Sequence, residues 1–179
     1  MNRIIKYTFL TIYILIIIVL IVESLKSGEE SAKISNDVTD VIVDIVENTN
    51  TDIPDIIVDK FIEEEINNDE IESLRTSNNF KYFIRKLFGH FGAYFILGFI
   101  TFITFNIFWS NKTKTLIWSL IFGVVFSIIT ELLQFIPIGR YPSVKDVVIN
   151  FTGYINGTLI ILVIYIVYTK IKERKISSN

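Results

Sequence analysis

The sequence predicts an all-α fold, an integral membrane four-helix bundle with an amphipathic helical extracytoplasmic insert. The chain of 179 residues is 51% hydrophobic and its mean hydropathy is +0.50. Such a composition is unusual for a soluble domain of this size. Four apolar runs also have the length of a membrane-spanning helix, residues 7–22, 90–108, 116–135 and 147–168. Each of them is about 24 to 33 Å long at the helical rise.

The first run, residues 7–22, looks like a signal peptide because Arg3 and Lys6 precede its apolar core. A signal peptide would continue into a cleavage site with small residues. The core is instead followed by the sequence ESLK at positions 23–26. We therefore expect residues 1–25 to be a retained N-terminal transmembrane anchor.

The charges of the chain are separated along its length. Residues 23–86 contain sixteen acidic and seven basic side chains, a difference of −9. The other segments between the runs are basic, with Arg3 and Lys6 at the start, Lys112 and Lys114 after the second run, and four cations at 170–175. The positive-inside rule then predicts cytoplasmic N- and C-termini and an extracytoplasmic segment at residues 23–87.

Residues 26–79 form the predicted acidic extracytoplasmic insert. Hydrophobic residues recur in it at helical spacing, at 38, 41, 42, 45 and 46 after the possible caps Ser35, Asn36 and Asp37, and again at 53, 57, 61, 62 and 66 around Pro54. These patterns predict two short amphipathic helices. A solvated variable insert explains them as well, and we assign the insert no chemistry.

Residues 80–170 form a predicted three-span domain, which residues 171–179 follow as a basic cytoplasmic tail. The domain opens with FKYFIRKLFGHFGAY at positions 80–94, where aromatic and basic residues fall on opposite sides of a helix. This pattern is typical of an interfacial helix that leads into a span. Gly89 and Gly92 would relax the entry point.

Polar residues recur at helical spacing in three of the runs. Glu131 and Gln134 share a face near the end of the third run, and His90 and Tyr94 share a face at the start of the second. On the fourth run the stripe consists of Asp146, Asn150, Gly153 and Gly157. With the predicted topology, all three groups lie at the same depth, and Arg140 and Lys145 lie beside them. An ionisable group stays in a membrane segment only when it faces protein, water or a partner. The sequence therefore predicts a polar site at the outer surface.

The expected ligand of this site is an anion. The second and fourth runs would both present helix N-termini here, with free amide donors and a positive partial charge. Arg140 and Lys145 add cationic side chains, and Lys86 or a protonated His90 would strengthen them. We expect Glu131 to pair with Arg140, because a carboxylate inside an apolar span needs a counter-charge or a proton.

Structural explanations stand beside each of these functional ones. Asp146 would cap the fourth helix after Ser143, and Gly153 with Gly157 is a small-xxx-small packing pattern. Gln134 and Asn150 would be hydrogen-bonding residues between helices, Tyr94 an aromatic-belt residue, and His90 an interfacial histidine without a partner.

At these residues the chain resembles the VanZ-like membrane family. The resemblance lies in KLFGHFGAYFILG at positions 86–98 and in ELLQFIPIGRYPSVKDVVINFTGYING at positions 131–157, and it covers about half of the chain. It implies that His90, Tyr94, Glu131, Gln134, Arg140, Asp146, Asn150, Gly153 and Gly157 are signature residues. The family's named member is associated with low-level resistance to the glycopeptide antibiotic teicoplanin, without a change in the peptidoglycan precursor. The acidic insert lies outside the resemblance.

Two functions stay open. The first is a non-enzymatic protein in which His90, Tyr94, Glu131, Gln134, Arg140, Lys145, Asp146 and Asn150 bind an anionic lipid headgroup, a lipid-linked cell-wall precursor or a lipoglycopeptide. The second is an intramembrane hydrolase or transferase with Glu131 or Asp146 as the base and His90 as the acid. A small transporter is the least favoured function, because four spans leave little room for two alternating gates. We expect no cofactor and no metal, since there is one histidine and no cysteine. The scattered basic residues exclude a nucleic-acid-binding surface.

Overall fold

The computed structural model describes residues 3–48, 78–109 and 111–177. In these residues all regular secondary structure is helical, which confirms the predicted all-α class. The elements are α1 (Arg3–Ser24), α2 (Gly28–Asn48), α5 (Asn78–Ile84), the π-helix η1 (Arg85–Gly92), α6 (Ala93–Phe108), α7 (Lys112–Leu133) and α8 (Val144–Ser177). The second amphipathic pattern predicted in the insert, at 53–66, lies outside the described residues.

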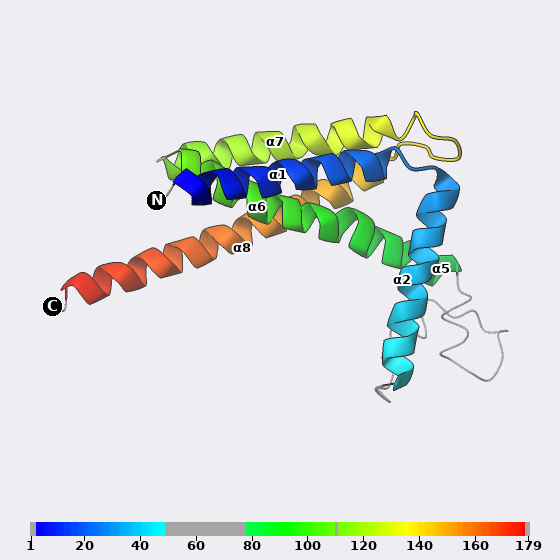
Figure 1. Cartoon of the computed structure of the whole chain (residues 1–179), viewed down its shortest axis with the longest axis horizontal. Helices are drawn as coiled ribbons and strands as arrows, with labels where there is room; N and C mark the ends of the chain where they lie inside the picture. Colours follow the sequence, from blue (N-terminus) through cyan, green and yellow to red (C-terminus); the bar gives the residue numbers. More distant parts are fainter. Residues whose placement is uncertain (1–2, 49–77, 110, 178–179) are drawn as a thin grey trace.

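Four of the described helices are long and apolar enough to cross a membrane. They are Arg3–Ser24, Asn78–Phe108, Lys112–Leu133 and Val144–Lys175. Each contains one of the four predicted runs, except that the third run, 116–135, extends two residues beyond its helix. In Figure 1 these four helices lie along the long axis of the molecule, and α8 continues past the others through the segment predicted to be a tail. The labelled N and C ends lie at the same end of the bundle. An even number of spans requires this arrangement.

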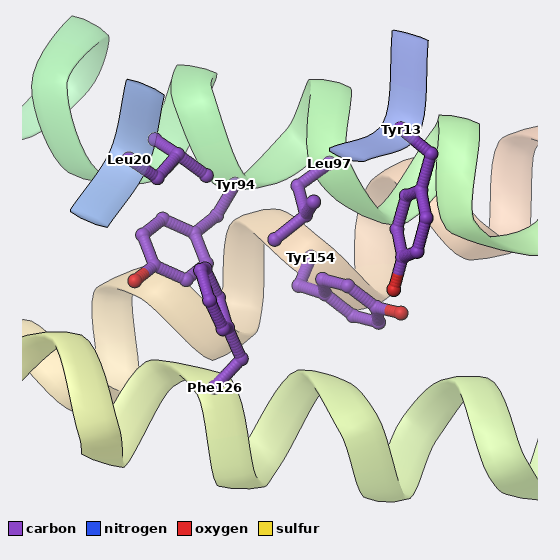
Figure 2. Packing of buried hydrophobic residues seen from close by; sticks show 6 residues of the cluster. All are labelled: Tyr13, Leu20, Tyr94, Leu97, Phe126 and Tyr154. Carbon is purple, nitrogen blue, oxygen red and sulfur yellow. The ribbon is translucent and has the colours of Figure 1, made fainter. Parts of the chain in front are cut away.

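The bundle is held together by a small core to which four helices contribute. The buried cluster consists of Tyr13 and Leu20 from α1, Tyr94 and Leu97 from α6, Phe126 from α7 and Tyr154 from α8 (Figure 2). The Tyr154 hydroxyl lies 2.9 Å from Ser119 Oγ, so the polar tip of this buried ring has a partner. Many of the outward side chains of the four long helices are exposed isoleucine, leucine and valine. Such a surface requires an apolar solvent.

The closest helix contact in the bundle is between α8 and the adjoining helices η1 and α6. A Cβ on Gly153 would lie 2.2 Å from the carbonyl oxygen of Phe91, and a Cβ on Gly157 would lie 2.0 Å from that of Phe95. Gly98 meets α8 in the same way, because its Cβ would lie 2.1 Å from the carbonyl oxygen of Tyr154. The structure therefore supports the packing interpretation of Gly153 and Gly157, in which small residues allow two backbones to touch.

The contact between the second and fourth long helices keeps a constant register. Three pairs of residues that differ by sixty positions are in contact along it, Lys86 with Asp146, His90 with Asn150, and Gly98 with Thr158. Because the two helices run in the same direction, a constant offset places successive turns of one opposite successive turns of the other. The glycines along this contact bring the polar residues at the end near α2 within reach of each other.

The predicted interfacial helix and the second span form one continuous helix, since α5, η1 and α6 follow each other without a break. The π-helical segment, which contains Gly89 and Gly92, lies at the junction where we expected the helix to relax. Wide π turns of this kind are frequent at functional sites. The segment η1 carries both Lys86 and His90 towards α8.

The helix α2 begins earlier than predicted. Ser27 caps it through a reciprocal pair of bonds with Glu30, in which the Glu30 amide donates to Ser27 Oγ at 3.2 Å and the Ser27 amide donates to Glu30 Oε2 at 2.9 Å. Ser35, one of the expected caps, lies inside the helix and donates to the carbonyl oxygen of Lys81 at 2.7 Å. The predicted apolar face was also wrong in part, because Val41 and Ile45 are exposed while Ser35, Thr39 and Val43 are buried.

The first turn of α2 packs on the turn between α7 and α8. The Gly28 amide donates to the carbonyl oxygen of Ile138 at 3.1 Å. A Cβ on Gly28 would lie 2.3 Å from the carbonyl oxygen of Gly139, which itself has a φ of 76°. Glycine at both positions allows this close approach. The first turn of α2 thus covers the end of the bundle where α8 begins (Figure 1).

The α6–α8 contact predicts a strong effect of adding one methyl group. Gly157→Ala would force two backbones apart and destabilise the folded protein by about 1 to 3 kcal/mol, the usual cost of overpacking. The matched control is Gly89→Ala, because a Cβ there would meet only a side-chain atom at 3.9 Å. Thermal unfolding in mild detergent should show a lower midpoint for Gly157→Ala and an unchanged or higher one for Gly89→Ala. Equal midpoints for the two variants would contradict the packing.

Candidate functional site

The predicted polar residues gather at the end of the bundle that α2 covers. Here η1, the last turn of α7, the turn 134–143 and the first turns of α8 come together (Figure 1). Six of the predicted site residues meet at this end, and all but Arg140 are buried: His90, Glu131, Gln134, Arg140, Asp146 and Asn150. Helical spacing in three separate segments, together with the predicted topology, predicted this convergence.

Two polar contacts join η1 to α8. The Lys86 ammonium forms an ion pair with Asp146 Oδ1. One turn further, His90 Nδ1 donates to Asn150 Oδ1 at 3.0 Å. His90 Nε2 lies 4.0 Å from Asp146 Oδ2, which is too long for a direct hydrogen bond. His90 therefore has a partner, and the interpretation of an unpaired interfacial histidine is wrong.

Glu131 is oriented by two neutral donors. The Ser143 amide donates to Oε1 at 2.8 Å, and Gln134 Nε2 donates to Oε2 at 2.7 Å. Gln134 thus forms its hydrogen bond within the end of its own helix. We expected both Gln134 and Asn150 to bond between helices, and only Asn150 does so. Through Ser143 the Glu131 carboxylate also ties the end of α7 to the start of α8. Asp146 is held by Lys86 rather than acting as the cap of α8.

Arg140 does not form the predicted hydrogen-bonded pair with Glu131. Its Nη1 donates to the carbonyl oxygen of Glu23 at 3.0 Å, because the turn places it beside the end of α1. Partial burial of the guanidinium, and then the like charge of Arg85, lower the pKa of Arg140 below its usual value, while Glu131 raises it. The group stays protonated, since arginine does not lose its proton in proteins. Arg140 is therefore a fixed cation whose attraction to Glu131 acts through space.

Tyr94 and Lys145 are the two predicted residues outside this group of six. The Tyr94 hydroxyl forms a hydrogen bond with Thr130 Oγ1, and its ring belongs to the apolar core. Tyr94 is therefore a buried packing residue rather than a member of the aromatic belt, and it also lines the smaller of two polar cavities at the site. Lys145 is exposed and lines neither of these cavities. The structure does not bring it together with the other predicted residues.

Sequence reasoning missed Arg85. This residue lines both cavities and lies 5.4 Å from the ring centroid of Tyr82. Its neighbour Lys86, which we considered only as an additional cation, holds Asp146. The signal was present, because Lys86, His90 and Tyr94 recur at intervals of four residues. The wide π turn that turns Arg85 towards the same cavity has no comparable signature in the sequence.

Two polar cavities open at the site. The larger has a volume of about 180 Å³, and the smaller has about 70 Å³. Both far exceed the roughly 10 to 15 Å³ that one water molecule needs. The larger cavity is lined by Arg85, Lys86, Arg140, Asp146 and His90, with Gln134, Tyr141, Gly28, Ser31 and Gly139. Three cations and one carboxylate thus face one small space, an arrangement that attracts an anion.

The expectation of two helix N-termini at the site was half right. The helix α8 begins there at Val144, but the second span does not begin there, because its helix continues back to Asn78 without a break. We expected a helix N-terminus here, but the backbone amides of this segment remain hydrogen bonded through the π turn. Side-chain cations on η1 therefore supply the positive charge that we attributed to backbone amides.

The buried acids and the histidine form a compact group of potential ligands. His90, Glu131 and Asp146 each offer one ligand atom, and these atoms all lie within 4.8 Å of one another. The expectation of no metal site rested on the single histidine of the chain. The structure shows that one histidine and two carboxylates converge, which is a set that a divalent cation uses.

A comparison with protein families gives one match. The family model described as VanZ/LLP1 matches residues 9–165, which is most of the chain and includes every site residue. No curated protein and no solved structure matches the chain. The matched range also includes the anchor and the insert, so it extends further than the resemblance noted from the sequence.

The Lys86–Asp146 pair predicts non-additive effects on stability. Lys86→Met leaves a buried carboxylate without its counter-charge and should cost about 3 kcal/mol. Asp146→Asn should cost less, because the lysine stem allows the ammonium to reach water. The double variant Lys86→Met/Asp146→Asn should recover most of the loss. Unfolding in detergent of all four proteins measures the coupling energy, and strictly additive effects would show that the ion pair does not exist.

Proposed function

We propose that this chain, which belongs to the VanZ/LLP1 family, binds an anionic headgroup at the outer surface of the cell membrane and in this way contributes to low-level teicoplanin resistance. The observation that carries the proposal is the cavity of about 180 Å³ into which Arg85, Lys86 and Arg140 face. Three fixed cations around one small space repel each other until an anion enters. The four long apolar helices support a multi-pass membrane location.

Charge-assisted hydrogen bonds favour a phosphate or carboxylate as the bound group. Arginine side chains bind both groups in a bidentate manner, and Lys86 contributes a point charge. Asp146 also lines the cavity, and its ion pair with Lys86 keeps the ammonium in place. A lipid headgroup, a lipid-linked cell-wall precursor or the lipoglycopeptide itself each carries such a group, and each is delivered by the membrane.

The proposed orientation places the cavity outside. The basic residues at 3–6, 112–114 and 170–175 would face the cytoplasm, and the acidic insert with the cavity would face the outer surface. The two ends of the chain lie together in Figure 1, which supports this topology. A pocket on the outer leaflet is where an antibiotic with a fatty acyl chain would meet the protein.

An enzyme is the second candidate, and one observation favours it. His90, Glu131 and Asp146 converge within 4.8 Å beside the cavity, as acid–base catalysis of transfer or hydrolysis on a lipid-linked substrate would require. Glu131→Gln distinguishes the two candidates. A binding protein would retain anion affinity and most resistance in this variant, whereas an enzyme would lose turnover of a lipid-linked phosphate.

Removing cavity cations should weaken anion binding and resistance together. Arg85→Gln and Arg140→Glu should each weaken the binding of short-chain phosphatidylglycerol by at least about tenfold, the equivalent of one lost charge-assisted bond. Native mass spectrometry in detergent measures this, with phosphatidylcholine and inorganic phosphate as comparison ligands. In a susceptible Gram-positive host, wild type should protect against teicoplanin but not vancomycin, and both variants should lose protection.

Lys145→Gln is the matched control, because it removes a nearby exposed cation that lines neither cavity. It should behave as wild type in both assays. Arg140 also holds the end of α1, so Arg140→Lys tests whether positive charge alone restores binding. Full resistance in a membrane-inserted Arg140→Glu variant would refute the proposal, as would equal protection against both antibiotics.

The orientation is testable because the chain contains no cysteine. Val144→Cys and Thr113→Cys introduce single thiols at exposed positions at opposite ends of the bundle. In intact cells a membrane-impermeant maleimide should label Val144→Cys and spare Thr113→Cys until the membrane is opened. The reverse pattern would place the cavity in the cytoplasm and exclude direct action at the outer leaflet.

A further inference from the structure

The relation between His90 and Asp146 is unusual for a buried pair. Asn150 offers His90 Nδ1 an amide oxygen at 3.0 Å, and an amide oxygen only accepts, so Nδ1 carries the proton. In the neutral ring, Nε2 then presents a lone pair. This nitrogen lies 4.0 Å from Asp146 Oδ2, so two acceptor atoms approach each other.

This distance suits two ligands of one metal ion. Bonds of about 2.0 to 2.2 Å from a divalent cation to nitrogen and oxygen place two of its ligands about 3 to 4.2 Å apart. Glu131 offers a third ligand atom, and a separation at the 4.8 Å limit of the set would have to shorten by about 0.6 Å to enter this range. A direct hydrogen bond between His90 and Asp146 would be shorter than 4.0 Å.

The surroundings of the three side chains resemble the outer shell of a metal site. Histidine ligands generally donate their second ring N–H to an oxygen, as His90 does to Asn150. Ligating carboxylates are likewise held by hydrogen bonds, as Glu131 is by the Ser143 amide and Gln134. Lys86 is paired with Oδ1 of Asp146, and Oδ2 lies 4.0 Å from His90 Nε2.

The charge on Glu131 supplies an independent argument. Its side chain is 2% exposed, and in the described part of the chain it forms no ion pair and is hydrogen bonded only by two neutral amides. Asp146, of like charge, lies within 4.8 Å. Two buried carboxylates this close require a proton or a cation to offset their repulsion. Lys86 is paired with Asp146, Arg140 attracts Glu131 only through space, and a divalent ion between the three groups would offset the repulsion that remains.

We propose that His90, Glu131 and Asp146 bind a first-row divalent cation. Among the common candidates, Zn²⁺ is the ion that they would bind most tightly. One imidazole nitrogen and two carboxylate oxygens match the ligands of Zn²⁺ and Mn²⁺, and Zn²⁺ binds such sets more tightly. Three protein ligands leave a coordination position for water or for an oxygen of an anion. His90 and Asp146 also line the larger cavity, so this position is accessible from it.

Zinc binding by the full-length protein tests the inference directly. After treatment with a chelator and its removal, the purified protein in detergent should bind one Zn²⁺ per chain in equilibrium dialysis with elemental analysis. His90→Gln, Glu131→Gln and Asp146→Asn should each weaken binding by at least tenfold. Asn150→Ala should weaken it about 10- to 100-fold, because it frees the ring that Asn150 orients. Zn²⁺ should raise the thermal midpoint of the wild type and not of the ligand variants.

Glu29→Gln is the matched control, since it removes an exposed carboxylate at the same end of the molecule and should bind as wild type. Absence of stoichiometric Zn²⁺ in the wild type would overturn the inference. Wild-type affinity in all three ligand variants would also overturn it, and would place the ion in the acidic insert. A ligand variant that fails to fold is replaced by Asn150→Ala, which keeps all three ligands. Phosphate binding by the zinc-free protein is measured separately, so the metal site and the anion proposal fail independently.

Discussion

Two carboxylates buried at one end of an apolar bundle are the constraint on which the rest of this structure depends. Placing Glu131 and Asp146 in a low-dielectric interior is costly unless each is hydrogen bonded and offset by positive charge. The protein meets this requirement by bringing three segments together. Lys86 lies against Asp146, the start of α8 donates to Glu131, and Arg140 lies close enough to attract it. These groups also shape the cavity.

The glycine contact between α6 and α8 holds these charged groups in position. Backbones that touch at Gly98, Gly153 and Gly157 keep the two helices in a fixed register. The register places Lys86 opposite Asp146 and His90 opposite Asn150. The ends of these helices near α2 can thus carry polar groups, because the glycine contacts further along supply the packing that holds them. The first turn of α2 covers this end through the Gly28–Gly139 contact, and the larger cavity lies beside it.

Sequence reasoning succeeded where the spacing within each helix and the order of the spans determine the outcome. The positions of His90, Glu131 and Asp146 in their spans predicted that they converge, and the spacing of the glycines predicted close packing. It failed where one segment must be placed against another. The partner of Arg140 is the end of α1, the second span continues through a π turn, and Lys145 faces outwards. None of these features follows from local periodicity, because each depends on the geometry of a turn or on a distant backbone carbonyl.

The central claim is that charged groups from three segments form one anion-binding cavity. An experimental structure in nanodiscs that contain phosphatidylglycerol tests it most directly. The account predicts phosphate density between Arg85, Lys86 and Arg140, with Glu131 bonded to the Ser143 amide and His90 facing Asp146. Density for no headgroup in the cavity, together with these side chains directed towards lipid or away from one another, would contradict it.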